Sequence, residues 1–309
     1  MSNPQMLDYL WLDGEVIPWA EANVHVTTVG VSASTAVFEG IRAYWNPTQE
    51  QLYVFRLDEH MRRLANSMKL VWMEPRCSAE ELVAAALELL RTNRVREDFY
   101  IRVIAFSSGS GFFAKGFEHE TRILIETPPI TSHLGDNESI ACCVSSWTRL
   151  ADNVMPPRVK CGSNYANNRR ALKEAQMNGY DNAIMLNSQG KVTETTVSCV
   201  FMIRDGTPIT SPVTSGILES ITRATLIKLF GEQLDRPVIE RDIDRTELYI
   251  ADELFCCGTG QEITAITAVD QFTVGQGEVG PITKEIESLY HSVVRGEAAD
   301  YMEWCTPVW

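Results

Sequence analysis

Residues 155–165 read Met-Pro-Pro-Arg-Val-Lys-Cys-Gly-Ser-Asn-Tyr, and Lys160 stands in the middle of this stretch. Two prolines precede the lysine, and Gly162-Ser163-Asn164 offers residues that commonly cap the start of a helix. The pattern predicts a lysine at a strand end, held by its backbone before a turn. Such a lysine can lose water around its amine, which favours the neutral nucleophile of Schiff-base chemistry. An ordinary surface lysine beside a loop is the alternative interpretation.

Three other segments could each bind one part of a phosphorylated, pyridine-containing cofactor. Residues 219–223 (Glu-Ser-Ile-Thr-Arg) open a predicted helix, and free N–H groups at a helix start bind phosphate. Residues 258–260 (Gly-Thr-Gly) follow a predicted strand and could add a hydroxyl and backbone donors. Glu194 could pair with a protonated pyridine nitrogen. Helix caps and turns use the same residue types, so a purely structural role stays open for each segment alone.

A fifth segment, Gly109-Ser-Gly-Phe-Phe-Ala114, matches the loose dinucleotide fingerprint G-x-G-x-x-A. Residues 115–117 (Lys-Gly-Phe) do not resemble the start of a helix, and a regular strand–helix–strand context is missing. An oxidoreductase is therefore the weaker hypothesis, as is a protein that only binds a small molecule.

Composition and charge exclude several other classes. The chain has 309 residues, a formal charge of −14 and a pI of about 4.9, so two soluble domains are expected and nucleic acid is an unfavourable partner. The first residues lack a secretory pattern and no run is apolar enough to span a membrane, which favours a cytoplasmic location. The eight cysteines lack metal-ligand spacing, and we expect them to be small buried residues.

The pattern of helices and strands predicts α+β domains. Before residue 128 we expect a hairpin around Asp13-Gly14, a helix from about Asp58, and a second helix opened by the capping box Ser78-Ala-Glu-Glu81. Further strands are predicted at 52–56, 99–106, 122–126, 140–147, 182–187, 198–204 and 253–257, and further helices at 164–178, 220–233 and 282–295. The turn-rich stretch from Pro128 divides the chain into a smaller domain (1–127), a linker (128–138) and a larger domain (139–309).

The ordered motifs resemble those of the branched-chain amino-acid aminotransferases, the fold-type-IV branch of the pyridoxal-phosphate (PLP) enzymes. The similarity runs from Trp11-Leu-Asp-Gly-Glu15 to Gly280-Pro-Ile-Thr-Lys284. Its other matching motifs are Val37-Phe-Glu-Gly-Ile-Arg-Ala-Tyr44, Glu59-His-Met-Arg-Arg-Leu64, Tyr100-Ile-Arg102, Val144-Ser-Ser-Trp147, Ile221-Thr-Arg223, Ala251-Asp-Glu253 and Gly258-Thr259. The resemblance implies a two-domain architecture with the active site in the interdomain cleft, and a homodimer.

The resemblance also implies roles for matching residues that would hold the cofactor. Lys160 would carry PLP as a Schiff base and move a proton between the substrate Cα and the cofactor C4′. Tyr165 would hydrogen-bond the phenolic oxygen, and Glu194 would keep the pyridine nitrogen protonated. The phosphate would be bound by Arg63, Ile221, Thr222 and Thr259.

For the substrate, the resemblance implies that Tyr100 and the backbone near Thr259 and Gly260 hold the α-carboxylate. Arg42 would support Tyr100, and Arg102 would meet the distal carboxylate of glutamate or 2-oxoglutarate. Phe38 would line the same pocket. These residues favour transamination between a branched-chain or other hydrophobic L-amino acid and 2-oxoglutarate.

Three departures from the family pattern affect the substrate side. Ala33-Ser34 replaces the usual Tyr-Gly and removes a ring and hydroxyl from the pocket. Residues 195–199 (Thr-Thr-Val-Ser-Cys) replace a glycine-rich run ending in Asn, and Glu219-Ser220 replaces a frequent Pro-Gly. A transaminase for D-amino acids or (R)-amines, or an aminodeoxychorismate lyase, therefore remains an alternative.

Overall fold

The computed structural model describes residues 7–33, 36–109, 120–128 and 130–309. The chain forms two compact units. Unit 1 contains Met1–Ser132, Val159–Ser163 and Val293–Trp309, and unit 2 contains His133–Arg158 and Asn164–Ser292. The two later segments of unit 1 lie beyond the linker at 128–138, so the chain crosses between the units more than once. The domain boundaries inferred from the sequence stay a prediction.

Unit 1 is built on a seven-stranded sheet whose neighbouring strands are all antiparallel, in the order β16-β4-β3-β5-β6-β1-β2. The strands are β1 (Tyr9–Leu12), β2 (Glu15–Pro18), β3 (Ala36–Asn46), β4 (Gln51–Phe55), β5 (Phe99–Ser107), β6 (Thr121–Glu126) and β16 (Cys305–Pro307). The predicted hairpin is confirmed as β1–β2. Asp13 and Gly14 both have positive φ, 52° and 113°, as the tight two-residue turn of a hairpin requires.

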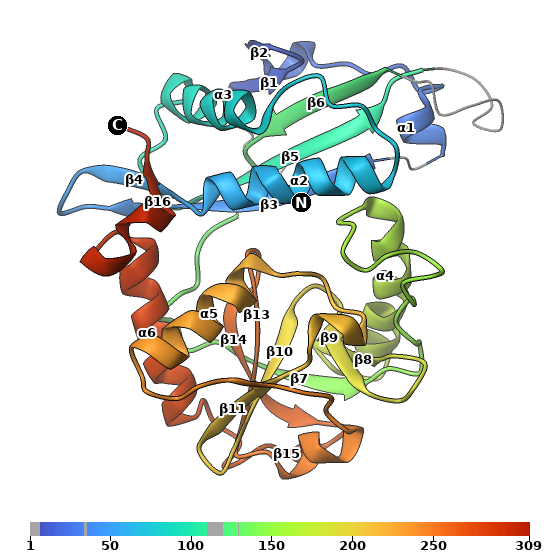
Figure 1. Cartoon of the computed structure of the whole chain (residues 1–309), viewed down its shortest axis with the longest axis vertical. Helices are drawn as coiled ribbons and strands as arrows, with labels where there is room; N and C mark the ends of the chain where they lie inside the picture. The colour runs from blue at the N-terminus through green and yellow to red at the C-terminus, as the bar shows by residue number, and fades with distance from the viewer. Residues whose placement is uncertain (1–6, 34–35, 110–119, 129) are drawn as a thin grey trace. The chain divides into compact units, whose positions relative to one another are not determined.

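Two helices cover one face of this sheet (Figure 1). Helix α2 (Leu57–Leu70) packs on β3, and α3 (Ala79–Thr92) packs on α2, β1 and β6. The predicted capping box opens α3, because Ser78 accepts from the Glu81 amide while the Glu81 side chain accepts from the Ser78 amide. A short helix, α1 (Val29–Ser32), lies against β5.

Unit 2 is a closed ring of strands. β9 pairs with both β8 and β10, so the order β10-β13-β14-β7-β8-β9 returns to its start, while β11, β12 and β15 extend it. The strands are β7 (Ser139–Val144), β8 (Asn182–Leu186), β9 (Val192–Thr195), β10 (Cys199–Arg204), β11 (Thr207–Thr210), β12 (Ile239–Glu240), β13 (Glu253–Gly258), β14 (Glu262–Val269) and β15 (Phe272–Thr273). The predicted helices at 164–178, 220–233 and 282–295 are confirmed as α4 (Gly162–Met177), α5 (Ile221–Glu232) and α6 (Pro281–Val294).

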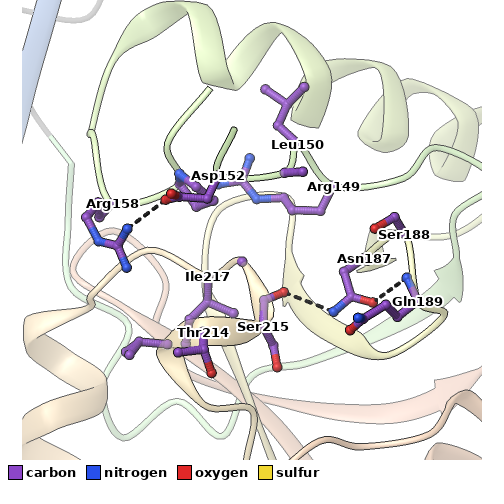
Figure 2. A pocket seen from close by; sticks show the side chains of 14 residues that line it. Arg149, Leu150, Asp152, Arg158, Asn187, Ser188, Gln189, Thr214, Ser215 and Ile217 are labelled. Carbon is purple, nitrogen blue, oxygen red and sulfur yellow. Dashed lines mark hydrogen bonds and ion pairs between the residues drawn. The ribbon is translucent and has the colours of Figure 1, made fainter. Parts of the chain in front are cut away.

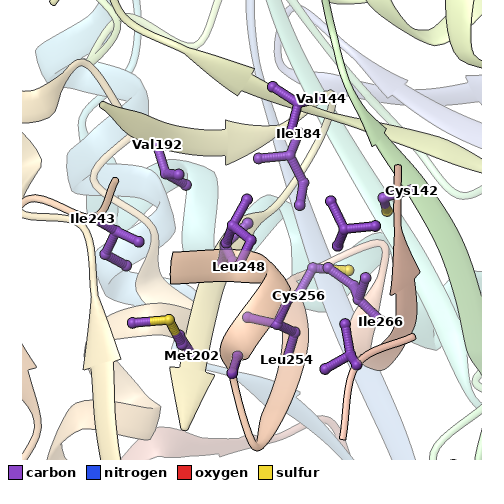
Figure 3. Packing of buried hydrophobic residues seen from close by; sticks show 14 of the residues in the cluster. Cys142, Val144, Ile184, Val192, Met202, Ile243, Leu248, Leu254, Cys256 and Ile266 are labelled. Carbon is purple, nitrogen blue, oxygen red and sulfur yellow. The ribbon is translucent and has the colours of Figure 1, made fainter. Parts of the chain in front are cut away.

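Alternation along the strands of unit 2 separates two sets of core side chains. Met202, Leu254 and Cys256 belong to the cluster that Figure 3 shows, together with residues from the other strands of the ring. Phe201 and Phe255, one position along, stack with ring centroids 5.0 Å apart and also meet Phe230 of α5. Helix α5 is thereby packed against β13.

The eight cysteines are all free thiols, and seven of them are buried while Cys77 is half-buried. This confirms the prediction of small buried residues for seven cysteines and not for Cys77. Among the helices within the described residues, none has the length and apolar character needed to cross a membrane.

Candidate active site

The main chain of Lys160 is fixed to unit 1. Its amide donates to Ser67 Oγ at 3.2 Å, and its carbonyl accepts from the Phe38 amide at 2.9 Å. The next residue, Cys161, forms an isolated β-bridge with Val37. The proline-flanked pattern predicted a backbone-held lysine, and the structure confirms this, although a single bridge to β3 holds it instead of a regular strand.

The side chain of Lys160 lies on the sheet face that carries Phe38. Its Nζ is 4.9 Å from the centre of the Phe38 ring. Because side chains alternate along β3, Gly40 and Arg42 point to this same face. The amine is therefore placed beside a defined strip of unit 1 and does not extend from an exposed helix.

Tyr100 and Arg42 occupy the same strip, and Gly40 makes room for them. Arg42 is directly opposite Tyr100 across the β3–β5 pair, and its guanidinium lies 5.9 Å from the centre of the tyrosine ring. Arg42 is almost fully buried and donates to the Ile130 carbonyl at 3.1 Å. A methyl group at Gly40 would overlap the Tyr100 hydroxyl, so the tyrosine lies where only glycine leaves space. The structure thus brings together Arg42 and Tyr100, two of the substrate residues predicted from the sequence.

Arg102 lies on this strip as well, and it has a partner that the sequence analysis missed. Its Nε donates to Glu126 Oε1 at 2.5 Å across the β5–β6 pair. The only sequence signal is a glutamate directly after the apolar run Ile123–Ile125. Ala33, the other predicted substrate residue here, is half-buried at the end of α1, where its amide donates to Val29 O at 2.8 Å. Ser34, the motif 110–114 and its neighbouring phenylalanines lie outside the described residues.

Arg63 is held on α2 by a buried carboxylate on the opposite face of β3. Its Nε and Nη2 donate to the two oxygens of Glu39 at 2.6 and 2.8 Å, and His60 Nδ1 lies 2.7 Å from Glu39 Oε2. Burial raises the pKa of Glu39, but the Arg63 charge and the hydrogen bonds from Arg63 and His60 outweigh it and lower the pKa to about 2. Burial lowers the pKa of His60 and outweighs the hydrogen bond and charge of Glu39, which raise it. The network fixes the guanidinium in one orientation.

In unit 2, Glu194 is a buried carboxylate with a buried counterion. Arg149 Nη2 lies 2.8 Å from Glu194 Oε1, and the side chains are 3% and 6% exposed. Arg149 Nη1 also donates to Asn168 Oδ1 at 3.0 Å, which orients the guanidinium from α4. No pattern in the sequence indicates Arg149, although it follows the Val144–Trp147 motif by two residues.

Glu194 also binds the chain that leads into α5. Its Oε2 accepts from the Leu218 amide at 3.1 Å. Ser220 caps the helix by accepting from the Arg223 amide at 3.2 Å, and Ile221 and Thr222 are the first two helical residues. A helix start with its orphan N–H groups favours an anion such as phosphate. The carboxylate and the helix start are thus linked through three residues of chain.

The remaining predicted cofactor residues also belong to unit 2. Thr259 and Gly260 form the turn between β13 and β14, and Tyr165 lies in the first turn of α4 with its side chain half-buried. Lys160, Arg63 and the substrate residues Phe38, Arg42, Tyr100 and Arg102 belong to unit 1.

A cavity of about 370 Å³ lies in unit 2 beside the Arg149–Glu194 pair. Figure 2 shows Arg158 ion-paired with Asp152 on one side and Asn187 hydrogen-bonded to Ser215 on the other. Its lining includes Arg149 and Ile217 but none of the residues predicted from the sequence. Polar groups that line the cavity bind one another, as these two contacts show. The Lys160 region is therefore the better candidate for the active site.

Comparison with known proteins places the chain among aminotransferases. Residues 36–269 match the family model described as amino-transferase class IV. A curated relative, the probable branched-chain-amino-acid aminotransferase of Aquifex aeolicus (strain VF5), is 41% identical over 303 residues, covering 98% of this chain and 97% of the relative.

Two solved structures are similar along almost the whole chain. The branched-chain amino acid aminotransferase from Thermobaculum terrenum in its PLP form has a TM-score of 0.95 and 46% identity, covering 98% of this chain and 99% of that one. The T.th. branched-chain amino acid aminotransferase, complexed with N-(5′-phosphopyridoxyl)-L-glutamate, has a TM-score of 0.93 and 32% identity, covering 99% and 100%. The α+β fold is therefore that of the fold-type-IV enzymes. With a family model that spans most of its length and relatives that match it end to end, the chain belongs to the class IV aminotransferase family.

Proposed function

We propose that the protein is a PLP-dependent aminotransferase that transfers the amino group of a branched-chain or other hydrophobic L-amino acid to 2-oxoglutarate. The observation that carries the proposal is the placement of Lys160, whose main chain is fixed to β3 and whose amine lies over Phe38. The names of the relatives in Aquifex aeolicus and Thermobaculum terrenum support the reaction class and the cofactor.

The residues present fit PLP. Glu194 is a buried carboxylate whose charge is already balanced by Arg149, so it could pair with a pyridinium nitrogen. The capped start of α5 offers N–H groups at Ile221 and Thr222, and the fixed guanidinium of Arg63 offers charge-assisted hydrogen bonds to a phosphate. Thr259 would add a hydroxyl to the phosphate, and Tyr165 a hydroxyl to the phenolic oxygen. When bound, the cofactor supplies a conjugated ring that accepts the electron pair released from the substrate Cα.

The chain's own groups would then carry out the proton transfers. The Lys160 amine would take the proton from the substrate Cα and deliver it to C4′ of the cofactor. Phe38 beneath the amine limits its path, because the ring occupies the sheet face along which the side chain lies. Glu194, held by Arg149 and the Leu218 amide, would keep a proton on the pyridine nitrogen through both half-reactions.

Substrate binding would use the strip of unit 1. Tyr100, supported by Arg42, would hold the α-carboxylate together with the backbone of Thr259 and Gly260. Arg102 would meet the distal carboxylate of 2-oxoglutarate, while Ala33 would leave space beside the donor's side chain. A phosphopyridoxyl-glutamate adduct in the T.th. relative supports a site that also accepts a dicarboxylate. The shared fold leaves D-amino acids and (R)-amines as the second candidate donors, favoured by the small side chain at Ala33.

Reductive trapping tests the proposal. Protein loaded with PLP should be yellow, and borohydride should attach the cofactor irreversibly to the peptide that contains Lys160. Lys160→Ala should retain PLP through its phosphate and lose turnover by about 100-fold or more. A donor screen with both enantiomers, using 2-oxoglutarate as acceptor, separates the two candidate donor classes. Label on another lysine would overturn the assignment.

A homodimer and a cytoplasmic location complete the proposal. The dimer is supported by the resemblance to the fold-type-IV enzymes. Sedimentation of the purified holoenzyme measures the first of these directly.

A further inference from the structure

Arg102 and Glu126 form an ion pair that the register of the sheet dictates. They are directly opposite one another on β5 and β6, and side chains at such positions lie close together on one face. Arg102 Nε donates to Glu126 Oε1 at 2.5 Å, and Nη2 contacts the same oxygen. The contact follows from strand pairing and does not depend on two flexible side chains meeting by chance.

The pair lies on the strip that also carries the proposed substrate residues. Arg102 pairs with Gly40, which lies two residues after Phe38 on the same face of β3. Arg102 also shares its face of β5 with Tyr100. The Lys160 amine lies over Phe38 on the same face. All of these residues belong to unit 1, so their arrangement follows from one sheet.

The two partners differ in their exposure. The Glu126 side chain is 10% exposed, whereas that of Arg102 is 47% exposed. A carboxylate with so little water around it depends on the Arg102 guanidinium for stabilisation. In turn, Glu126 places a negative charge beside that guanidinium. A second carboxylate that approaches Arg102 must displace Glu126 or accept repulsion from it. The Arg102–Glu126 pair has zero net charge. An apolar substrate side chain that approaches it neither displaces Glu126 nor is repelled by it.

We propose that Glu126 is a specificity-determining residue that weakens the binding of dicarboxylate oxo acids by occupying Arg102. The inference rests on the proposed function, in which Arg102 meets the distal carboxylate of 2-oxoglutarate. Glu126 makes 2-oxoglutarate a poorer acceptor than it would be with Arg102 alone, and it shifts selectivity toward oxo acids with apolar side chains.

The test compares two acceptors in the holoenzyme with one amino donor. The acceptors are 2-oxoglutarate and 4-methyl-2-oxopentanoate, and the quantity is the ratio of their kcat/KM values. Glu126→Gln keeps the shape of the side chain and removes its charge. We expect the ratio to rise about tenfold in favour of 2-oxoglutarate, mainly through KM, which corresponds to ~1.4 kcal/mol. A ratio that stays the same or falls in the folded variant overturns the inference.

A double-mutant cycle separates this role from a structural one. In an Arg102→Gln background the Glu126→Gln substitution should no longer raise the ratio, since the guanidinium that it releases is gone. Asp13→Asn is the matched control, because Asp13 accepts from Arg122 Nε in the same sheet at 2.5 Å but lies at the β1–β2 turn. It should leave the ratio as in the parent.

Two further outcomes are informative. If Glu126→Gln does not fold, Glu126→Ala takes its place: it also removes the charge beside Arg102, so the ratio should rise, and an unchanged ratio overturns the inference. If the parent protein converts neither acceptor with any amino donor, the proposed function fails. If the parent converts both acceptors and the ratio of kcat/KM values is unchanged in Glu126→Gln, only the specificity role of Glu126 fails.

Discussion

The guanidinium of Arg149 lies 2.8 Å from the carboxylate of Glu194, with both side chains almost fully removed from solvent. Two opposite charges in such a place depend on one another, because each would otherwise be an uncompensated buried ion. The pair therefore fixes the position of the carboxylate proposed to face the cofactor.

Replacing Arg149 by Met should lower the free energy of unfolding by about 3–5 kcal/mol, since Glu194 is left buried without a counterion. Urea unfolding of the apo and holo forms measures the change. Arg158→Met is the matched control in unit 2, because its ion pair with Asp152 is 40% and 65% exposed. Exposed pairs contribute about 1 kcal/mol or less. Equal losses in the two variants would contradict the buried-pair argument.

Glu194→Gln should leave PLP bound but slow the amino-donor half-reaction by about 100-fold or more, because the charge that keeps the pyridine nitrogen protonated is lost. Stopped-flow absorbance with leucine in single turnover measures this rate separately from folding. A rate equal to that of the parent would leave Glu194 as a structural residue only.

The Glu39–Arg63 contact predicts a pH dependence of stability. The pKa of Glu39 is lowered from 4.5 to about 2 in the folded protein, so its contribution is fully present above about pH 4.5 and is lost as the pH falls toward 2. Glu39→Gln should therefore cost up to about 3 kcal/mol near pH 7. The difference from the parent should shrink below pH 4.5 in urea unfolding series. Glu74→Gln, at an exposed carboxylate, should show no such convergence.

Gly40→Ala should push Tyr100 away from its place, because the added methyl overlaps the tyrosine hydroxyl. We expect KM for amino donors to rise about tenfold or more, as a charged hydrogen bond to the α-carboxylate is worth ~1.5–3 kcal/mol. Gly231→Ala is the control: a Cβ there meets nothing within 4 Å, and the helix should gain up to about 1 kcal/mol. In steady-state kinetics, KM for amino donors should rise in Gly40→Ala and stay at the parent value in Gly231→Ala.

Ala33→Tyr should narrow the range of amino donors and lower KM for 2-oxoglutarate. The ring would fill space beside the donor side chain, where each buried CH₂ contributes about 0.8 kcal/mol, and the hydroxyl would add a hydrogen bond to a distal carboxylate. A donor panel that includes aromatic amino acids and primary amines measures the range. If both quantities stay the same, Ala33 does not line the pocket, and the parent need not accept larger donors.

Local signals in the sequence predicted the elements that local chemistry specifies. The Asp13-Gly14 turn and the Ser78 capping box lie where their residue types indicate, because a turn and a helix cap need only a few neighbouring residues. Strand β3 carries the motif Val37–Tyr44, but the sequence pattern does not predict a strand there. Its buried run contains Glu39 and Arg42, polar residues that argue against a core strand until their partners on α2 and at Ile130 are known.

Motifs in the sequence predict the site residues, but they do not predict the charged residues that pair with them. Arg149, Glu126 and Glu39 contact Glu194, Arg102 and Arg63 across separations of 24 to 45 positions in the chain. An ion pair between distant positions depends on the pairing of strands and the packing of helices, and a single sequence carries no periodicity that reports it. Each of the three missed residues supplies a counterion and not a reacting group.

Strand β16 lies at the edge of the unit 1 sheet, pairs with β4, and leads to Val308, whose amide donates to Leu52 O at 2.9 Å. The residues of unit 2 all precede it in the chain. During synthesis, a ribosome therefore delivers the whole of unit 2 before unit 1 can receive its last strand. Domains fold as units while the chain emerges. The six earlier strands of this sheet must wait, with the edge at β4 open to pairing, until β16 has been made.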